Sequence, residues 1–263
     1  MNGAEISTNT EGSKKVIEFT VELAGVPVLM RSCSEINKER MRKYLTDKAP
    51  LAVVEPTDED IETLKKAFDR QSKKYNFPAE KYGRESLEYF LMHLQVADKL
   101  LPFNVLLLHG SAICMDGEVY IFIAPSGTGK STHTRLWREQ FGDRCYMIND
   151  DKPLIRFEGD DIRVYGTPWA GKHNLERNTS APLKAIIQLR RGSENHIERF
   201  PKDKAYYSIM KQGYHSPRKD EKIKTLRLQK ILVETVDFYE LTCNMEPDAA
   251  WTAWKGMNQS DNV

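Results

Sequence analysis

The sequence predicts an α/β protein in which a small N-terminal α+β domain precedes a larger core with a phosphate-binding loop. Three observations lead to this prediction. Segments that alternate apolar and polar residues are interleaved with segments of helical periodicity. The apolar run EVYIFI enters a glycine-rich turn, APSGTGKS, and a helical segment follows directly. Leucine-rich strands replace charged helices near Asn104, which marks the expected boundary between the two parts.

The small domain is expected over residues 16–103, after a flexible tail over residues 1–15. VIEFTVEL and AGVPVLMRS both have strand character, and the Ala-Gly pair at their junction favours a turn, so they predict a hairpin. Thr57 and Asp60 have the spacing of a capping box at the start of a helix. The other elements expected in this domain are a helix over 34–45, a strand over 51–56 and helices over 57–75 and 84–102.

The core is expected over residues 104–263. Its first two strands, over 105–115 and 118–124, are joined by Asp116 and Gly117, a favoured hairpin turn. The remaining elements expected in the core are a helix over about 130–140, a strand over 145–148, a strand over 231–243 and a terminal helix over 246–257.

Residues 199–230 are locally rich in Lys and Arg. The stretch YHSPRKDEKIK within them has the composition of a loop. A mobile segment that docks an acidic protein or peptide would have this pattern, and so would a solvated charged face. Both interpretations stay open at this point.

The glycine-rich turn has the chemistry of a phosphate-binding loop. Gly127 and Gly129 permit positive φ, so that successive backbone N–H groups can surround phosphate oxygens at the start of a helix. Lys130 would neutralise the β and γ phosphates, and the Ser131 hydroxyl would bind Mg²⁺. The pattern G-x-x-x-x-G-K-[ST] is met except that Ala124 stands in place of its first glycine. The alternative is a capped strand-to-helix turn with a surface lysine.

We therefore expect ATP and Mg²⁺ as cofactors of this chain. The residues expected to bind the nucleotide are Ser126, Gly127, Thr128, Gly129, Lys130, Ser131 and Thr132.

A pair of carboxylates follows the turn by about twenty residues, in CYMINDDKPLIRF. Adjacent side chains on a continuing strand point to opposite faces, so Asp150 and Asp151 are assigned different roles. Asp150 is expected to be the base that accepts the proton of an attacking hydroxyl group. Asp151 is expected to hold Mg²⁺, directly or through water. A solvated Asp-Asp turn is the alternative interpretation.

A histidine precedes the same region in LLLHGSAI. His109 ends one strand of the hairpin whose other strand enters the glycine-rich turn. The neighbouring leucines favour a core histidine with a satisfied ring, whereas Gly110 permits a close approach to the phosphates or to Asp150. The residues alone leave these two possibilities equal.

The residues HG, APSGTGKS and NDD, in this order and spacing, resemble the HPr kinase/phosphorylase family and its relatives in the phosphoenolpyruvate carboxykinase-like P-loop superfamily. The resemblance covers about residues 105–190 and implies an HPr kinase-like P-loop core. It further implies His109 as an active-site histidine, Lys130 as the phosphate lysine, Ser131 as a metal ligand and Asp150 as the proton acceptor for phosphorylation. Asp150, His109 and Lys130 are thus the expected catalytic residues, with Ser131 and Asp151 as metal ligands.

The chain departs from that family in two places. HPr kinases have a metal-binding glutamate after the aspartate pair and a catalytic arginine in a later loop, for which Glu176 and Arg177 are candidates by location alone. The stretch YGTPWAGKHN is not the HPr kinase sequence at that place, which leaves the protein HPr in doubt as a substrate. The residues of this stretch that could contact a substrate are Thr167, Trp169, Lys172, His173 and Asn174. A turn with one buried tryptophan is the alternative.

Composition limits the classes of partner. The formal net charge is +1 with a pI near 7.7, so neither nucleic acid nor a membrane surface is expected as a partner. No signal peptide or membrane span is expected, because the start of the chain is polar and no apolar run is long enough. The four cysteines form no C-x-x-C pair, which is typical of a protein of the reducing cytoplasm. An oligomer stays possible.

The expected function is an ATP-dependent kinase that transfers the γ phosphoryl group to a hydroxyl group, expected to be a serine of a protein or peptide. Two alternatives are a small-molecule kinase that acts on serine or an organic acid, and an ATP-binding sensor or partner-binding module without catalysis. ADP formation with free serine would favour the first alternative. Tight ATP binding without turnover would favour the second.

Overall fold

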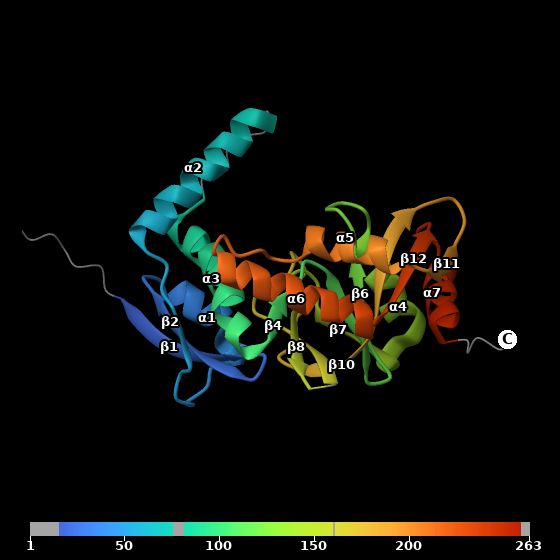
Figure 1. The fold of residues 1–263 in the computed structure, drawn as a ribbon, viewed down its shortest axis with the longest axis horizontal. Coiled ribbons are helices and arrows are strands. Elements are labelled where there is room, and N and C mark those ends of the chain that lie inside the picture. Colours follow the sequence, from blue (N-terminus) through green and yellow to red (C-terminus); the bar gives the residue numbers. More distant parts are fainter. Residues whose placement is uncertain (1–15, 76–81, 160, 259–263) are drawn as a thin grey trace, which may run out of the picture.

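The computed structural model describes residues 16–75, 82–159 and 161–258. The tail expected over residues 1–15 lies outside the described residues. The fold is mixed α/β, with a small three-stranded sheet and a curled nine-stranded sheet (Figure 1). No helix in the described part of the chain is both long and apolar enough to span a membrane.

The N-terminal elements form a sheet of order β1-β2-β3 with helices packed against it. Their bounds are β1 Ile17–Leu23, β2 Val26–Ser32, α1 Glu35–Arg40, β3 Ala52–Val54, α2 Asp58–Tyr75 and α3 Arg84–Leu100. The predicted hairpin is confirmed, because β1 and β2 pair through a turn in which Ala24 and Gly25 both have positive φ. The capping box is confirmed too: Thr57 and Asp60 each accept a hydrogen bond from the other's backbone N–H at 3.1 and 2.9 Å.

The helix predicted over 34–45 is shorter than expected. It ends at Arg40, and a 3₁₀ turn, Arg42–Tyr44, follows it. The Tyr44 ring is buried in the apolar core beneath the small sheet, and the Leu45 backbone forms a β-bridge with Val21. The chain therefore leaves the helical path because tertiary contacts draw it toward the sheet.

The larger sheet contains the expected core. Its strands and helices are β4 Val105–Leu107, β5 Ser111–Met115, β6 Glu118–Ile123, α4 Lys130–Phe141, β7 Cys145–Asn149, β8 Leu154–Glu158, β9 Asp161–Tyr165, β10 Ser180–Arg191, β11 His196–Arg199, α5 Lys202–Gln212, α6 Lys219–Thr235, β12 Asp237–Cys243 and α7 Asp248–Asn258. The long strand β10 pairs with β9 near its start and lies between β6 and β12, parallel to both, further on.

Two helical layers cover the two faces of the sheet around β6 (Figure 1). Alternation along β6 divides its side chains between two apolar clusters. Ile121 packs with residues of α5 and α6, and Phe122 packs with residues of α4 and α7. Because both faces are buried, β6 is an apolar run in the sequence rather than an alternating one.

The strand predicted over 105–115 is two strands. β4 pairs with β8, whereas β5 pairs with β6 and β7. The break falls on Leu108, His109 and Gly110, whose N–H groups donate to the carbonyl oxygens of Pro153, Gln212 and Asp151 respectively. The chain changes partners at this point, and its backbone N–H groups are satisfied by two separate segments, one at Asp151 and Pro153 and one at Gln212. The hairpin turn predicted at Asp116 and Gly117 is confirmed, since both have positive φ between β5 and β6.

The strand predicted over 231–243 begins only at Asp237. Its first residues belong to α6, where the apolar run Ile231–Val233 continues a helical pattern. The buried positions of α6 are Thr225, Leu228, Gln229, Leu232 and Val233. The loop predicted over 214–224 is also wrong in part, because α6 starts at Lys219. The basic residues of 199–230 therefore lie largely on α5 and α6.

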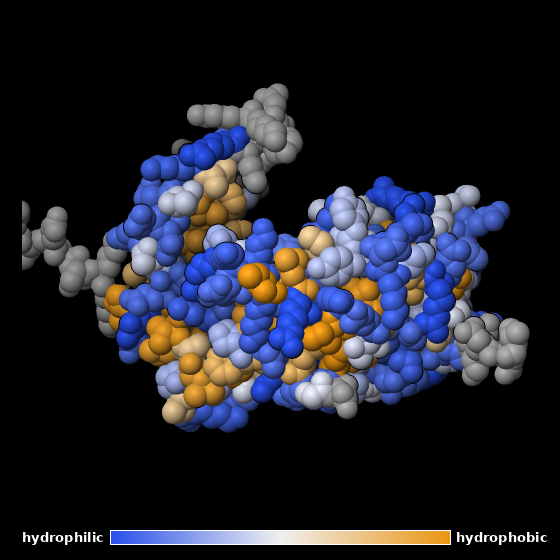
Figure 2. Space-filling view, viewed as in Figure 1, coloured by the Kyte–Doolittle hydropathy of each residue, from blue (hydrophilic) through white to orange (hydrophobic). Residues whose placement is uncertain are grey.

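The apolar core continues from the small sheet into the larger one. Trp169 and Leu107 pack in the same cluster as residues of β1, β2 and α3. Helices α2 and α3 form an arm with its own small cluster around Ile61 and Leu87, and Figure 2 shows apolar side chains at the surface beside α2. The boundary near residue 103 stays a prediction.

Candidate active site

The expected site residues meet at one edge of the larger sheet. β6 and β7 are both antiparallel to β5, so their C-terminal ends lie at the same edge, where β5 begins. The register places Ser111 opposite Phe122, and Ala112 opposite Asn149. The glycine-rich turn, the carboxylate pair and His109 therefore leave the sheet side by side.

The glycine-rich turn connects β6 to α4 and needs its glycines for backbone conformation. Gly127 and Gly129 have φ of 78° and 123°, which L side chains rarely adopt. A Cβ at either position would meet no atom within 4 Å, so space is not the constraint. Arg191 at the end of β10 donates to the carbonyl oxygens of Gly127 and Thr128, the latter at 3.0 Å, and fixes the turn from that side.

Lys130 opens α4 and turns back over the end of β6. Its side chain is largely buried, and its Nζ donates to the Ala124 carbonyl oxygen at 2.8 Å. The same Nζ lies 3.3 Å from His109 Nε2. Burial lowers the pKa of Lys130, the Asp151 carboxylate counteracts this, and the Lys152 charge lowers it further. The ammonium group donates to two uncharged acceptors and keeps a third N–H that can donate to an anion.

His109 belongs to a charged cluster with Asp151 and Lys152. Its Nδ1 lies 2.8 Å from Asp151 Oδ1 and 3.1 Å from Lys152 Nζ, and Lys152 Nζ lies 2.9 Å from the same carboxylate oxygen. A tautomer with the proton on Nδ1, assigned from these contacts, donates to Asp151 and leaves Nε2 to accept from Lys130. Burial alone would raise the pKa of Asp151, but His109 and Lys152 more than offset it and hold the pKa at about 2. Asp151 is thus a weak base.

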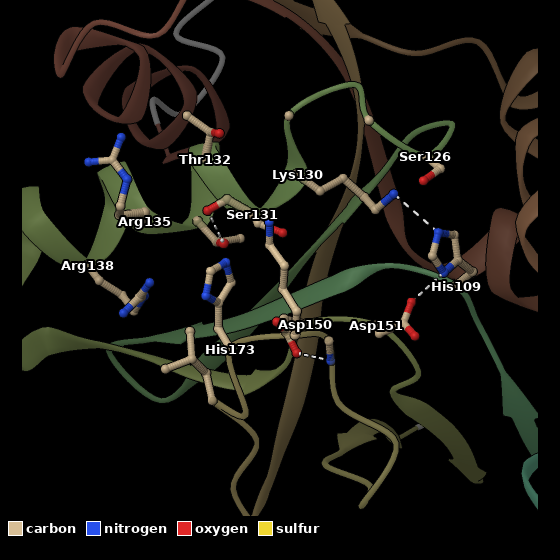
Figure 3. A pocket seen from close by; sticks show the side chains of 16 residues that line it. His109, Ser126, Lys130, Ser131, Thr132, Arg135, Arg138, Asp150, Asp151 and His173 are labelled. Carbon is tan, nitrogen blue, oxygen red and sulfur yellow. Dashed lines mark hydrogen bonds and ion pairs between the residues drawn. The ribbon is translucent and has the colours of Figure 1, made fainter. Parts of the chain in front are cut away.

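Asp150 has different surroundings. Its side chain is 7% exposed, and its Oδ1 accepts a hydrogen bond from the Gly171 N–H at 2.6 Å. A Cβ at Gly171 would lie 2.6 Å from Asp150 Oδ2, so glycine is required for this close approach. The Ser111 hydroxyl donates to the Asp150 carbonyl oxygen at 3.1 Å. The carboxylate is held in place and still faces the cavity (Figure 3).

Asn149 ends β7 and orders the turn that separates the two carboxylates. Its Oδ1 accepts from the backbone N–H groups of Asp151 and Lys152 at 2.9 and 2.7 Å. Its Nδ2 donates to the Thr167 hydroxyl oxygen at 3.0 Å, and that hydroxyl donates to the Lys152 carbonyl oxygen. Because the strand ends at Asn149, both carboxylates can face the same cavity.

These groups surround a cavity of about 860 Å³ (Figure 3). The expected residues that line it are His109, Ser126, Gly127, Gly129, Lys130, Ser131, Thr132, Asp150 and Asp151. Thr128, expected to bind the nucleotide, does not line this cavity and lies on the side of the turn that Arg191 contacts.

The candidates from YGTPWAGKHN separate into two groups. Lys172 and His173 line the cavity. Trp169 is buried in the core of the small sheet and donates from Nε1 to the Tyr89 carbonyl oxygen at 3.0 Å. Thr167 is fully buried between Asn149 and Lys152, and Asn174 forms a turn with φ of 48°. The last three residues therefore shape the loop and do not line the cavity.

Glu176 and Arg177 do not line the cavity either. Glu176 pairs with Lys43 of the N-terminal region at 2.7 Å. The Arg177 guanidinium lies over the Tyr146 ring, 4.6 Å from its centroid. Both candidates therefore make contacts outside the cavity.

Sequence reasoning missed three cationic residues near the cavity. Arg135 and Arg138 line it from α4, and Lys152 contacts His109 and Asp151. Ser131, Arg135 and Arg138 are spaced i, i+4 and i+7, which places them along one face of the helix. That spacing was the available signal for the two arginines.

The donor set accommodates Mg²⁺ in the manner typical of nucleotide sites. No group of three or more His, Cys, Asp or Glu residues within the described ranges could hold a metal ion alone. Mg²⁺ in nucleotide sites is usually held by one or two carboxylates together with substrate phosphates and water. Ser131 and Asp151 line the same cavity, and Asp151 stays ionised at neutral pH, so the residues fit this pattern.

Comparisons with known proteins name no family for this chain and find similarity only among solved structures. No family model and no curated protein matches the chain. Among solved structures, it is similar to the Hpr(Ser) kinase/phosphatase from Coxiella burnetii, with 7% identity and a TM-score of 0.33. The match covers 57% of this chain and 95% of the other. This is a distant relationship of fold.

Proposed function

We propose that this chain is an ATP-dependent kinase that transfers the γ phosphoryl group to a hydroxyl group, with a serine of a protein or peptide as acceptor. One observation carries the proposal: the glycine-rich turn, the buried Lys130 and the Asp150 carboxylate open onto the same cavity at the C-terminal edge of the sheet. A surface lysine after a capped turn would need neither burial nor a facing carboxylate. The arrangement thus favours phosphate binding over that alternative.

The proposed reaction assigns a separate role to each residue. The backbone N–H groups of the turn and Lys130 bind the β and γ phosphates and stabilise the charge spread over the transferring group. Mg²⁺, held by Ser131 and Asp151, would supply further charge neutralisation when bound. Asp150 accepts the hydroxyl proton while the hydroxyl oxygen bonds to the γ phosphorus and the bond to the β–γ bridging oxygen breaks, which releases ADP. Asp151 is less suited to this proton transfer, because its pKa is near 2.

His109 is proposed to position Lys130 and Asp151. It bridges them through Nε2 and Nδ1, so the ammonium group and the carboxylate keep a fixed separation. Proximity of prepositioned charges is the main contribution that a protein can make to phosphoryl transfer.

The test is incubation of the purified protein with γ-labelled ATP, Mg²⁺ and a lysate of its host, with Asp150→Asn as the control. Label in a discrete protein or peptide, absent with the variant, is the expected result and identifies the acceptor. ADP formation without a labelled macromolecule would instead favour a small-molecule kinase. ATP binding with no ADP formation would contradict catalysis and favour a sensor.

A further inference from the structure

One end of the cavity carries positive charge that the proposed phosphoryl transfer does not use. Arg138 comes from α4, and Lys172 and His173 come from the loop between β9 and β10. Figure 3 shows Arg138 and His173 at the end of the cavity away from His109. Across the ranges that the structure describes, none of these three side chains forms an ion pair with a carboxylate.

The other cations in or beside the cavity already have partners among the described residues. Lys152 contacts Asp151 at 2.9 Å, and Arg135 contacts Glu139 at 2.7 Å. Arg138 differs, because its Nε is buried from solvent and has no hydrogen-bond partner among the described residues. Arg138 thus lines the cavity without an acceptor for its Nε among the described residues.

The position of these side chains favours contact with the acceptor over contact with the nucleotide. Arg138 lies seven residues beyond Ser131 on α4, about 10 Å along the helix from the expected phosphate site. Gly171, which binds the Asp150 carboxylate, directly precedes Lys172 and His173. The loop that orients the expected base thus also presents Lys172 and His173.

We propose that the acceptor carries an anionic group, a carboxylate or a phosphate, near its reactive hydroxyl group, and that Arg138, Lys172 and His173 bind this group. The inference rests on the proposed function and narrows its substrate class. The planar guanidinium of Arg138 suits both anions, because it can donate two parallel hydrogen bonds. An anion held at this end would orient the adjacent hydroxyl toward Asp150.

The test first fills the phosphate site with a non-hydrolysable ATP analogue and Mg²⁺, and then titrates three small probes by calorimetry. Glycerol 3-phosphate and glycerate each carry hydroxyl groups and an anion, whereas glycerol is neutral. We expect at least one of the two anionic probes to bind, and we expect glycerol not to bind. Stronger binding of glycerol 3-phosphate indicates a phosphate on the acceptor, and stronger binding of glycerate indicates a carboxylate. Equal behaviour of all three probes would overturn the proposal.

Substitution of Arg138 then locates the binding. Arg138→Met is expected to weaken the anionic probes about tenfold or more and to leave the affinity for the ATP analogue unchanged. Lys184→Met is the matched control, because Lys184 is an exposed cation of β10 that pairs with Glu118 away from the cavity. If Arg138→Met does not fold, Lys172→Met at an exposed position serves instead. A loss of analogue affinity in Arg138→Met would show that these cations serve the nucleotide, and would overturn the proposal.

The two possible failures are distinguishable. If the wild-type protein binds the ATP analogue but prefers no anionic probe, the inference is wrong and the proposed kinase remains. If the wild-type protein does not bind the analogue with Mg²⁺, the proposed function fails and the inference falls with it.

Discussion

Two buried carboxylates of this chain have contrasting surroundings. Glu88 in α3 is 1% exposed and accepts hydrogen bonds from the Ser32 hydroxyl at 2.7 Å, the Asn37 amide at 2.9 Å and a backbone N–H at 3.0 Å. Asp150 is 7% exposed, and among the described residues only the Gly171 N–H donates to its side chain. A carboxylate whose acceptor sites are filled holds structure, whereas one with free acceptor sites facing a cavity can take a proton.

The contrast is tested most strongly by Asp150→Asn. The amide keeps the shape of the side chain but cannot accept the hydroxyl proton, so turnover should fall by about 10² to 10⁴. Nucleotide affinity should stay near that of the wild type. Phosphoryl transfer measured with γ-labelled ATP, alongside nucleotide binding by calorimetry, separates the two effects. Turnover at the wild-type rate would show that Asp150 is not the base.

Lys130→Ala should act mainly by weakening nucleotide binding. Loss of a charge-assisted contact to the phosphates is expected to weaken ATP binding by about tenfold to a hundredfold. Because the Lys130 side chain is largely buried, thermal unfolding must be recorded for the variant as a control. A folded variant with unchanged nucleotide affinity would contradict phosphate binding at the glycine-rich turn.

Glu88→Ala should lower the stability of the protein and leave nucleotide binding unchanged. Removal of the carboxylate leaves the donors of Ser32 and Asn37 only their longer contacts, each at 3.3 Å, and the free energy of unfolding should fall by about 1 to 3 kcal/mol. Denaturant titration measures this change. The affinity for nucleotide of the folded fraction should not change, and a selective loss of that affinity would show that the Glu88 cluster also supports the site.

The last prediction concerns His93, a buried histidine of α3 near Trp169. Burial, and to a lesser degree the Lys152 charge, lower its pKa to about 4 from an ordinary value near 6.5. Between these values the unfolded chain binds a proton that the folded chain does not, so the free energy of unfolding should fall as pH drops from about 6.5 to about 4. His93→Gln should flatten this dependence in denaturant titrations at several pH values. If the free energy of unfolding changes with pH equally in the variant and the wild type, His93 is not the cause of the dependence.

Local chemistry explains which parts of the fold were predictable. The turns at Ala24 and Asp116, and the capping box at Thr57, depend on residues a few positions apart, and the sequence contains all of that information. The division of 105–115 depends on where Leu108 and His109 find backbone partners, which lie near Pro153 and Gln212. Such distant contacts leave no periodic signal in a short window.

The candidate site shows the same limit. The glycine-rich turn and Asp150 were predictable from spacing alone, because strand, turn and helix follow one another in the chain. Arg138 could have been found from its i+7 spacing to Ser131, whereas Lys152 required the orientation of the His109 ring. Trp169 was a candidate substrate contact because it shares a loop with Lys172. Its ring instead packs in the apolar core beneath the small sheet.

The position of β10 bears on the order in which the chain can fold. One neighbour of β6 is β5, its hairpin partner. The other neighbour is β10, which begins at Ser180, and β12, which pairs with β10, begins at Asp237. Arg191, which binds the carbonyl oxygens of the glycine-rich turn, lies at the end of that late strand. During synthesis from the N-terminus, the turn is therefore made well before the residue that fixes it. The turn should reach the conformation that the proposed phosphate binding needs only after residues through β10 have left the ribosome and paired with β6.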